Sequence, residues 1–228
     1  MVAVTARANY AAGLSRTLAK QAIKQNRIVI NTTMARSGSE ILTDTDKILF
    51  DGEILSLPGT RYIMLHKPAG IVCTRSDSHH ADIFSLIDNS LDLHAAGRLD
   101  ADTTGLVLLT NDGQWSHRVT SPRHQHHKIY LVSLAQILTT EQQLQLTSGV
   151  MLSGENKPTL PATVEIINTM QIRLGLQEGK YHQVKRMLAA VGNNVTSLHR
   201  ESIGDIQLND LQGAAWRELT PNEVHSFQ

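Results

Sequence analysis

Two aspartates, Asp100 and Asp102, lie in the glycine-flanked stretch AAGRLDADTTGLVLLTNDG at residues 95–113. Arg98 stands two positions before the first aspartate, and the apolar run GLVLLT follows shortly after the second. A carboxylate in such a loop can act as a nucleophile, can transfer a proton, or can simply bond to its own backbone in a turn. The elements around the loop must decide which chemistry it supports.

One candidate chemistry is that of the haloacid-dehalogenase-like phosphatases, in which one aspartate attacks phosphorus and a second acts as acid and base. That chemistry places the pair at the carboxyl end of a buried strand and needs a magnesium site. Here the buried strand GLVLLT follows the pair, and the preceding segment DLHAAGRL is not an apolar, strand-like run. The phosphatase interpretation is therefore disfavoured, and a turn role for Asp100 stays open.

The composition is that of an ordinary globular chain of 228 residues, 41% of them hydrophobic. Cys73 is the only cysteine, which excludes an internal disulfide and a multi-cysteine zinc site and fits a reducing compartment. No apolar stretch approaches the ~20 residues of a membrane span. The N-terminal stretch MVAVTARANYAAGLSR has no apolar core long enough for a secretory signal, so we expect a cytoplasmic protein, with a transit peptide left open.

Charge is balanced in total, with 21 basic and 21 acidic residues, but it is unevenly distributed. Residues 1–39 contain six basic side chains and no acidic one, and residues 115–130 contain three basic side chains, four histidines and no acid. Such local cationic surfaces can hold a phosphate backbone, although a solvated charged face would look the same. The histidines have no cysteine or nearby carboxylate to complete a metal shell, so we predict no metal site.

Turn signals and periodicity divide the chain into a small and a larger part. Residues 14–26 predict an amphipathic helix with Ser15 as N-cap and with Leu18 and Ala22 facing inward, and an inward position for Ile23 stays open. The stretch LPGT at 57–60 predicts a domain boundary. Strands are predicted at RIVIN, KILFDG, RYIMLHK, GLVLLT, KIYLVSL, ATVEIIN, MQIRLGLQ, VTSLHRESI and WRELT, and the NDG that follows GLVLLT is predicted to be a turn.

Residues 180–192, KYHQVKRMLAAVG, predict a second helix. Its apolar positions are Val184, Met187, Leu188 and Val191, at i, i+3, i+4 and i+7, and Gly192 ends it. Thr220 and Pro221 predict a last short helix. Strands that do not alternate regularly with helices indicate an α+β fold.

Several motifs in order resemble the pseudouridine synthases: GRLDADTTGLVLLTNDG, then KIYLVSL, then EGKYHQVKRMLAAVG. The resemblance covers nearly the whole chain from about residue 14. It implies a catalytic aspartate at Asp100, a base-stacking tyrosine at Tyr130 and a basic partner of the aspartate at Lys185. It also implies an S4-like RNA-binding domain at residues 1–58 and a catalytic domain at residues 59–228, with a mixed or antiparallel sheet, flanking helices and a central cleft.

The activity that this resemblance implies is conversion of a uridine of 16S ribosomal RNA, position 516 in the usual numbering of that RNA, into pseudouridine. The reaction involves no redox step, so we expect no cofactor, and the carboxylate could act as nucleophile or assist elimination. The expected partner is small-subunit ribosomal RNA within a partly assembled ribonucleoprotein, bound by a monomer. A non-catalytic S4-type RNA-binding or assembly protein is the alternative. The predicted RNA contacts are Arg16, Lys20, Lys24, Arg27, Arg98, Arg118, Arg123, Lys128 and Arg186.

Overall fold

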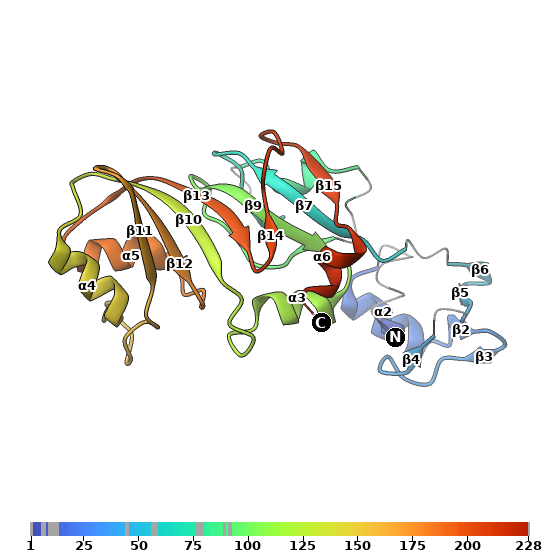
Figure 1. The fold of residues 1–228 in the computed structure, drawn as a ribbon. Coiled ribbons are helices and arrows are strands. Elements are labelled where there is room, and N and C mark those ends of the chain that lie inside the picture. Colours follow the sequence, from blue (N-terminus) through green and yellow to red (C-terminus); the bar gives the residue numbers. More distant parts are fainter. Residues whose placement is uncertain are drawn as a thin grey trace. The chain divides into compact units, whose positions relative to one another are not determined.

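The computed structural model describes the chain except residues 1, 6–7, 9–13, 44–45, 56–58, 76–79, 89, 91–92 and 228, and except the side chains of Val2, Ala3 and Arg16. The chain divides into two compact units, Met1–Thr60 and Arg61–Gln228 (Figure 1). The boundary predicted from the sequence, between residues 58 and 59, falls beside this division. Within the described residues, no helix has the length and apolar character needed to cross a bilayer.

The N-terminal unit contains helix α2 (Arg16–Lys24) and short strands. Ser15 caps the helix as predicted, because its Oγ accepts a hydrogen bond from the Leu18 amide at 3.2 Å. The inward position predicted for Leu18 is wrong, because that side chain is 50% exposed, and the buried stripe contains Ala19, Ala22 and Ile23. Strands β3, β2, β5 and β6 form one antiparallel sheet in that order, and β1 pairs with β4. The strands are β1 (Val2–Ala3), β2 (Ile28–Ile30), β3 (Thr33–Met34), β4 (Ile41–Leu42), β5 (Ile48–Phe50) and β6 (Glu53–Ile54).

The described part of the larger unit forms a nine-stranded mixed sheet with the main order β11-β12-β10-β13-β9-β7-β15. Every pair is antiparallel except β13 with β9, which run parallel at the centre. β14 pairs with β13, and β8 pairs with β9. The strands are β7 (Tyr62–Lys67), β8 (His94–Ala95), β9 (Thr104–Thr110), β10 (Lys128–Leu134), β11 (Thr163–Asn168), β12 (Gln171–Leu176), β13 (Val195–Ile203), β14 (Ile206–Gln207) and β15 (Trp216–Glu218).

Strand β9 is buried on both faces, which explains its unbroken apolar sequence. Alternate residues point to opposite sides of a strand, so Val107 and Leu109 enter one core while Leu106 and Leu108 enter the other. Gly105 begins the run with φ +111°, and a Cβ there would lie 2.3 Å from the Arg200 carbonyl oxygen. Only glycine therefore lets β9 approach β13 this closely.

Helices cover both faces of the sheet (Figure 1). α4 (Thr140–Ser148) and α5 (Gln183–Ala190) contribute to the core that contains Val107, which we call the first core. α3 (Gly113–Thr120) and α6 (Pro221–His225) contribute to the core that contains Leu106, the second core. A short 3-10 helix, η1 (Ile83–Leu86), also packs into the first core. The turn predicted at NDG is instead the start of α3, because Asp112 Oδ1 accepts hydrogen bonds from the Gln114 and Trp115 amides at 2.9 and 3.0 Å.

Candidate active site

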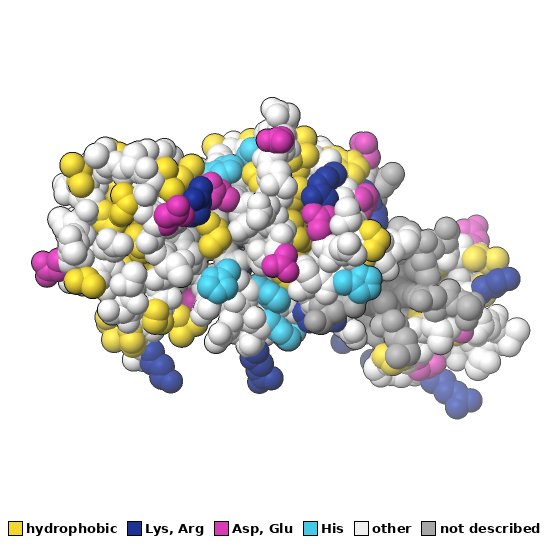
Figure 2. Space-filling view, viewed as in Figure 1, with side chains coloured by type: hydrophobic (Ala, Val, Ile, Leu, Met, Phe, Trp, Pro, Cys, Tyr) yellow, Lys and Arg dark blue, Asp and Glu magenta, His cyan; other side chains and the backbone are white. Residues whose placement is uncertain are grey.

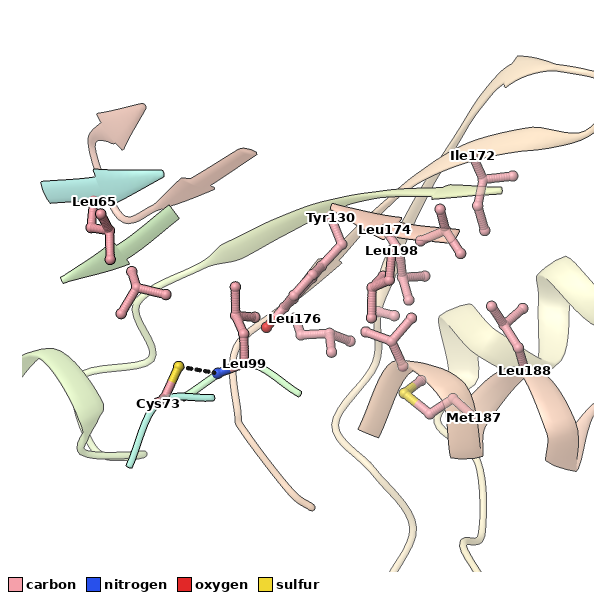
Figure 3. Close-up of a cluster of buried hydrophobic side chains, with 14 of the residues drawn as sticks. Leu65, Cys73, Leu99, Tyr130, Ile172, Leu174, Leu176, Met187, Leu188 and Leu198 are labelled. Carbon is pink, nitrogen blue, oxygen red and sulfur yellow. Dashed lines mark hydrogen bonds between the residues drawn. The ribbon is translucent and has the colours of Figure 1, made fainter. Parts of the chain in front are cut away.

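The loop that carries Asp100 leads directly into β9, and buried contacts fix it on both sides of the aspartate. Leu99 is 8% exposed, and its amide donates to Cys73 Sγ at 3.4 Å (Figure 3). The Thr103 amide donates to the Asp100 carbonyl oxygen at 3.1 Å and closes a turn. The carboxylate is therefore presented by a fixed loop.

Lys67, the last residue of β7, anchors the loop that carries Asp100. Its side chain is fully buried, and its Nζ donates to the carbonyl oxygens of Pro68, Ala101 and Thr103 at 2.9, 3.1 and 2.7 Å. Burial lowers the pKa of this ammonium, and the nearby Cys73, Asp102 and Asp100 oppose the effect. Three carbonyl acceptors satisfy the three donors of the ammonium, so Lys67 ties β7 to the aspartate loop.

Lys185, in the first turns of α5, reaches both aspartates of the loop. Its Nζ lies 3.0 Å from Asp100 Oδ2 and 2.7 Å from Asp102 Oδ1. Partial burial lowers the pKa of Lys185, but the hydrogen bonds to Asp102 and Asp100 and the charges of these carboxylates together leave the pKa raised. The hydrogen bond from Lys185 likewise lowers the pKa of Asp102. Asp102 therefore pairs with the same ammonium as Asp100.

His182 holds the second oxygen of Asp100, with its Nε2 3.1 Å from Oδ1. It stands just before α5 with φ +47°, a left-handed conformation that is uncommon for a residue with a side chain. Such strain persists only where the surrounding structure imposes it, and it is common at functional sites. Lys185 and His182 together fix the orientation of the Asp100 carboxylate.

Tyr130, on β10, faces the same place. Its side chain is buried, and Figure 3 shows it extending from the strand toward Leu99 and Leu176. Asp100, Tyr130 and Lys185 all line one pocket of about 160 Å³. The structure therefore brings together the three residues predicted to be catalytic.

The pocket is cationic. Its charged lining consists of Asp100 and Glu178 against Arg98, Lys128, Lys180, Lys185 and Arg200. An excess of positive side chains in the lining of a pocket attracts phosphate groups. Of the predicted RNA contacts, Arg98 and Lys128 belong to this lining. Burial, with a contribution from Arg200, lowers the pKa of Lys128 to about 8.

In the N-terminal unit, Lys20 and Lys24 are exposed and line a shallow pocket together with Arg36. Arg27 is differently placed, because its Nε donates to Asp51 Oδ1 at 2.8 Å and its guanidinium lies over the Phe50 ring. Its charge is thus largely matched within the unit. The side chain of Arg16 lies outside the described residues.

The remaining predicted RNA contacts of the larger unit do not line this pocket. Arg118 on α3 donates through Nε to the Phe227 carbonyl oxygen at 3.0 Å. Arg186 donates to the carbonyl oxygens of Tyr181 and Ser153 at 3.1 and 2.6 Å, so it has a structural task. Arg123 is exposed in the loop between α3 and β10.

The histidine-rich loop before β10 forms a ring cluster. The His124 and His126 rings stack 5.8 Å apart, and His126 also packs edge-on against Phe227 at 4.7 Å. Figure 2 shows histidine side chains gathered over this part of the larger unit. Among the residues that the structure describes, no three His, Cys, Asp or Glu side chains converge as a set of metal ligands.

Sequence reasoning missed three residues of the site: His182, Lys67 and Arg200. Arg200, on β13, is 2% exposed, and its Nε donates to the Leu106 carbonyl oxygen at 2.7 Å. Its Nη2 is buried and has no hydrogen-bond partner among the described residues. A buried donor without a partner is costly, which marks this nitrogen as a place for an acceptor group from a ligand or an ordered water.

Comparison with known proteins places this site in a family. Residues 61–190 match the family model described as RNA pseudouridylate synthase. The chain is 48% identical over 218 residues to ribosomal small subunit pseudouridine synthase A of Yersinia pestis, with 94% of this chain and 93% of the relative covered. The corresponding protein of Pasteurella multocida is 45% identical over 219 residues, with 94% of each chain covered.

A solved structure agrees with this result. A crystal structure of a pseudouridylate synthase matches with a TM-score of 0.73 and 43% identity, and the match covers 100% of each chain. The sequence over 94% of the chain and the fold therefore agree on one family. The chain belongs to the RNA pseudouridylate synthase family and is an enzyme of that family.

Proposed function

We propose that this enzyme converts one uridine of 16S ribosomal RNA, position 516 in the usual numbering, into pseudouridine. The names of the relatives, ribosomal small subunit pseudouridine synthase A, support the class of RNA. The observation that carries the chemistry is the Asp100 carboxylate, held by Lys185 and His182 at 3.0 and 3.1 Å in the wall of a cationic pocket.

The reaction breaks the bond between N1 and C1′, turns the freed uracil, joins C5 to C1′ and releases the C5 proton, while N1 gains a proton. We assign to Asp100 the breaking of the bond at C1′. Its carboxylate acts either as the nucleophile that attacks C1′ or as the group that assists elimination. Lys185 donates a hydrogen bond to Asp100 Oδ2 at 3.0 Å and so holds the carboxylate in place. No electron is gained or lost, so the reaction requires no redox cofactor.

Tyr130 is proposed to stack on the uracil while the base turns. Its ring lies in the pocket with Leu176 and Leu198, which gives the base an apolar surface to turn against. Arg98, exposed at the pocket, is proposed to contact the phosphate backbone or to occupy the space that the flipped base leaves. The alternative of a purely RNA-binding protein leaves this arrangement around Asp100 without a purpose.

The N-terminal unit is proposed to be an S4-like domain that supplies affinity for RNA. The exposed Lys20 and Lys24 beside Arg36 support this assignment. We further propose that the enzyme acts in the cytoplasm as a monomer on a partly assembled small ribosomal subunit.

The test is release of tritium from 16S RNA that contains uridine labelled at C5. Only isomerisation at that carbon frees the label, so release reports the reaction directly. Sequencing of the product for pseudouridine then gives the position, and 23S RNA serves as the control substrate. Release from 23S RNA alone, or conversion at a different 16S uridine, would refute the proposed target while leaving the family assignment intact.

A further inference from the structure

An aromatic side chain stands exposed beside the catalytic pocket without a described role. Tyr181 is 72% exposed, although tyrosine is a residue of intermediate burial in most proteins. Its ring stacks on His182, with centroids 3.7 Å apart and planes 22° apart. One face of the Tyr181 ring is therefore covered by His182, and the high exposure leaves the other face open to solvent.

The backbone around Tyr181 is held firmly. Arg186 donates from Nη1 to the Tyr181 carbonyl oxygen at 3.1 Å. The Lys180 amide donates to Gln183 Oε1 at 2.8 Å, and the Lys180 ammonium pairs with Glu155 at 2.8 Å. An aromatic ring on a backbone with this many bonds loses little conformational freedom when a partner stacks on it.

The position of Tyr181 relative to the pocket is specific. Lys180 and His182 line the catalytic pocket, whereas Tyr181, between them in sequence, does not. His182, on which the Tyr181 ring stacks, in turn contacts the Asp100 carboxylate, with its Nε2 3.1 Å from Oδ1. Tyr181 thus lies outside the pocket that contains Asp100 but directly beside two residues of its lining.

We propose that the open face of Tyr181 binds the nucleobase that adjoins the target uridine, by stacking. This inference rests on the proposed function and adds to it a binding subsite for a second, unpaired nucleotide. An aromatic face accepts any of the four bases, because each base has a π-face, so the subsite contributes affinity and not sequence choice. Lys180 beside it favours the phosphate that links the two nucleotides.

The experiment is a cycle of protein and RNA changes. Single-turnover conversion is measured against enzyme concentration for wild type, Tyr181→Leu and Tyr181→Phe. The RNAs are an intact 16S fragment and two copies that carry an abasic nucleotide directly 5′ or 3′ of the target uridine. Ile137→Ala, which alters another exposed apolar side chain of the same unit, is the matched control. Gel-shift binding of the same RNAs is measured in parallel.

With intact RNA, Tyr181→Leu should raise the half-saturating enzyme concentration about 5- to 150-fold, the range expected for one base–aromatic stack. Tyr181→Phe keeps the ring and should stay within about twofold of wild type. With the RNA that lacks the stacked base, wild type should be weakened similarly, and Tyr181→Leu should add nothing further.

The inference is overturned if Tyr181→Leu weakens all three RNAs by the same factor, or weakens none of them. It is also overturned if only the maximal rate falls, because the ring would then serve only to hold His182. Failure of the proposed function looks different: wild type would convert no RNA. The gel-shift cycle still measures the coupling between Tyr181 and the neighbouring base in that case.

Discussion

The Lys185 ammonium lies 3.0 Å from Asp100 Oδ2, although 85 positions separate the two residues in the chain. The same ammonium lies 2.7 Å from Asp102 Oδ1, so one cation serves two carboxylates. Their surroundings differ: the Asp100 side chain is 26% exposed and also contacts His182, whereas the Asp102 side chain is 73% exposed. A partly buried carboxylate at the pocket is the better candidate for a reacting group.

This difference predicts unequal effects of two matched substitutions. Asp100→Asn keeps the shape but removes the charge, so tritium release should fall by about three orders of magnitude or more. Asp102→Asn should reduce the rate by about tenfold or less, because Lys185 keeps its bond to Asp100. RNA affinity of both variants should remain within a few fold of wild type, and thermal unfolding should confirm that both are folded. A folded Asp100→Asn variant with a near-normal rate, beside an inactive Asp102→Asn variant, would move the chemistry to Asp102.

Substitution of Lys67 should lower both the stability and the activity of the enzyme, although Lys67 itself is not proposed to contact the substrate. Lys67→Met keeps the length of the side chain but leaves the carbonyl oxygens of Pro68, Ala101 and Thr103 without their donor. We expect a loss of about 2–4 kcal/mol in the free energy of unfolding, and a lower maximal rate because the Asp100 loop loosens. Urea unfolding measures the first effect and single-turnover conversion the second. An unchanged unfolding free energy would contradict the anchoring role.

The sequence could predict the elements whose pattern is local. Helix α5 has the buried residues Val184, Met187 and Leu188 that its periodicity indicates, and β10 spans the Lys128–Leu134 segment that the KIYLVSL motif predicted. Burial also agrees for β9, since an unbroken apolar run is typical of a strand covered on both faces. In these segments the local pattern and the tertiary structure demand the same thing.

The residues that the sequence could not reveal owe their roles to contacts between distant segments. Lys67 precedes the turn residues Pro68 and Gly70 and would pass for a solvated lysine, but it is fully buried because β7 lies between β9 and β15 and its ammonium bonds to the Asp100 loop. His182 adopts a positive φ, a backbone conformation that the periodicity of the sequence does not reveal. Leu18 is exposed because the buried side of α2 consists of Ala19, Ala22 and Ile23, a stripe that does not include position 18.

The lowered pKa of Lys128 should make RNA binding depend on pH. Its pKa is lowered to about 8 by burial and by Arg200, so the ammonium is charged below this value and neutral above it. A contact with phosphate needs the charged form, and affinity should therefore weaken as pH rises from 7 to 9, by roughly fivefold for one such contact. Lys128→Arg stays charged throughout and should remove most of this change. Filter binding of one RNA to both proteins measures it, and identical pH profiles would contradict the assignment, since titration of the RNA itself is common to both.

Removal of cations from the N-terminal unit should change the salt dependence of RNA binding but not the rate of the chemical step. Lys20→Gln combined with Lys24→Gln removes two exposed cations that lie together, while leaving the buried face of α2 intact. Each phosphate contact contributes about 0.7–0.9 to the slope of log affinity against log salt, so the double variant should lower that slope by about 1.4–1.8. The maximal rate of conversion at saturating enzyme should stay unchanged, because these residues belong to the other unit from Asp100. Lys47→Gln, a single lysine of the same unit outside this pocket, is the control and should leave the slope unaltered. If the double variant binds RNA with the wild-type slope, the unit does not hold the phosphate backbone through these lysines, and its proposed S4-like role loses its main support.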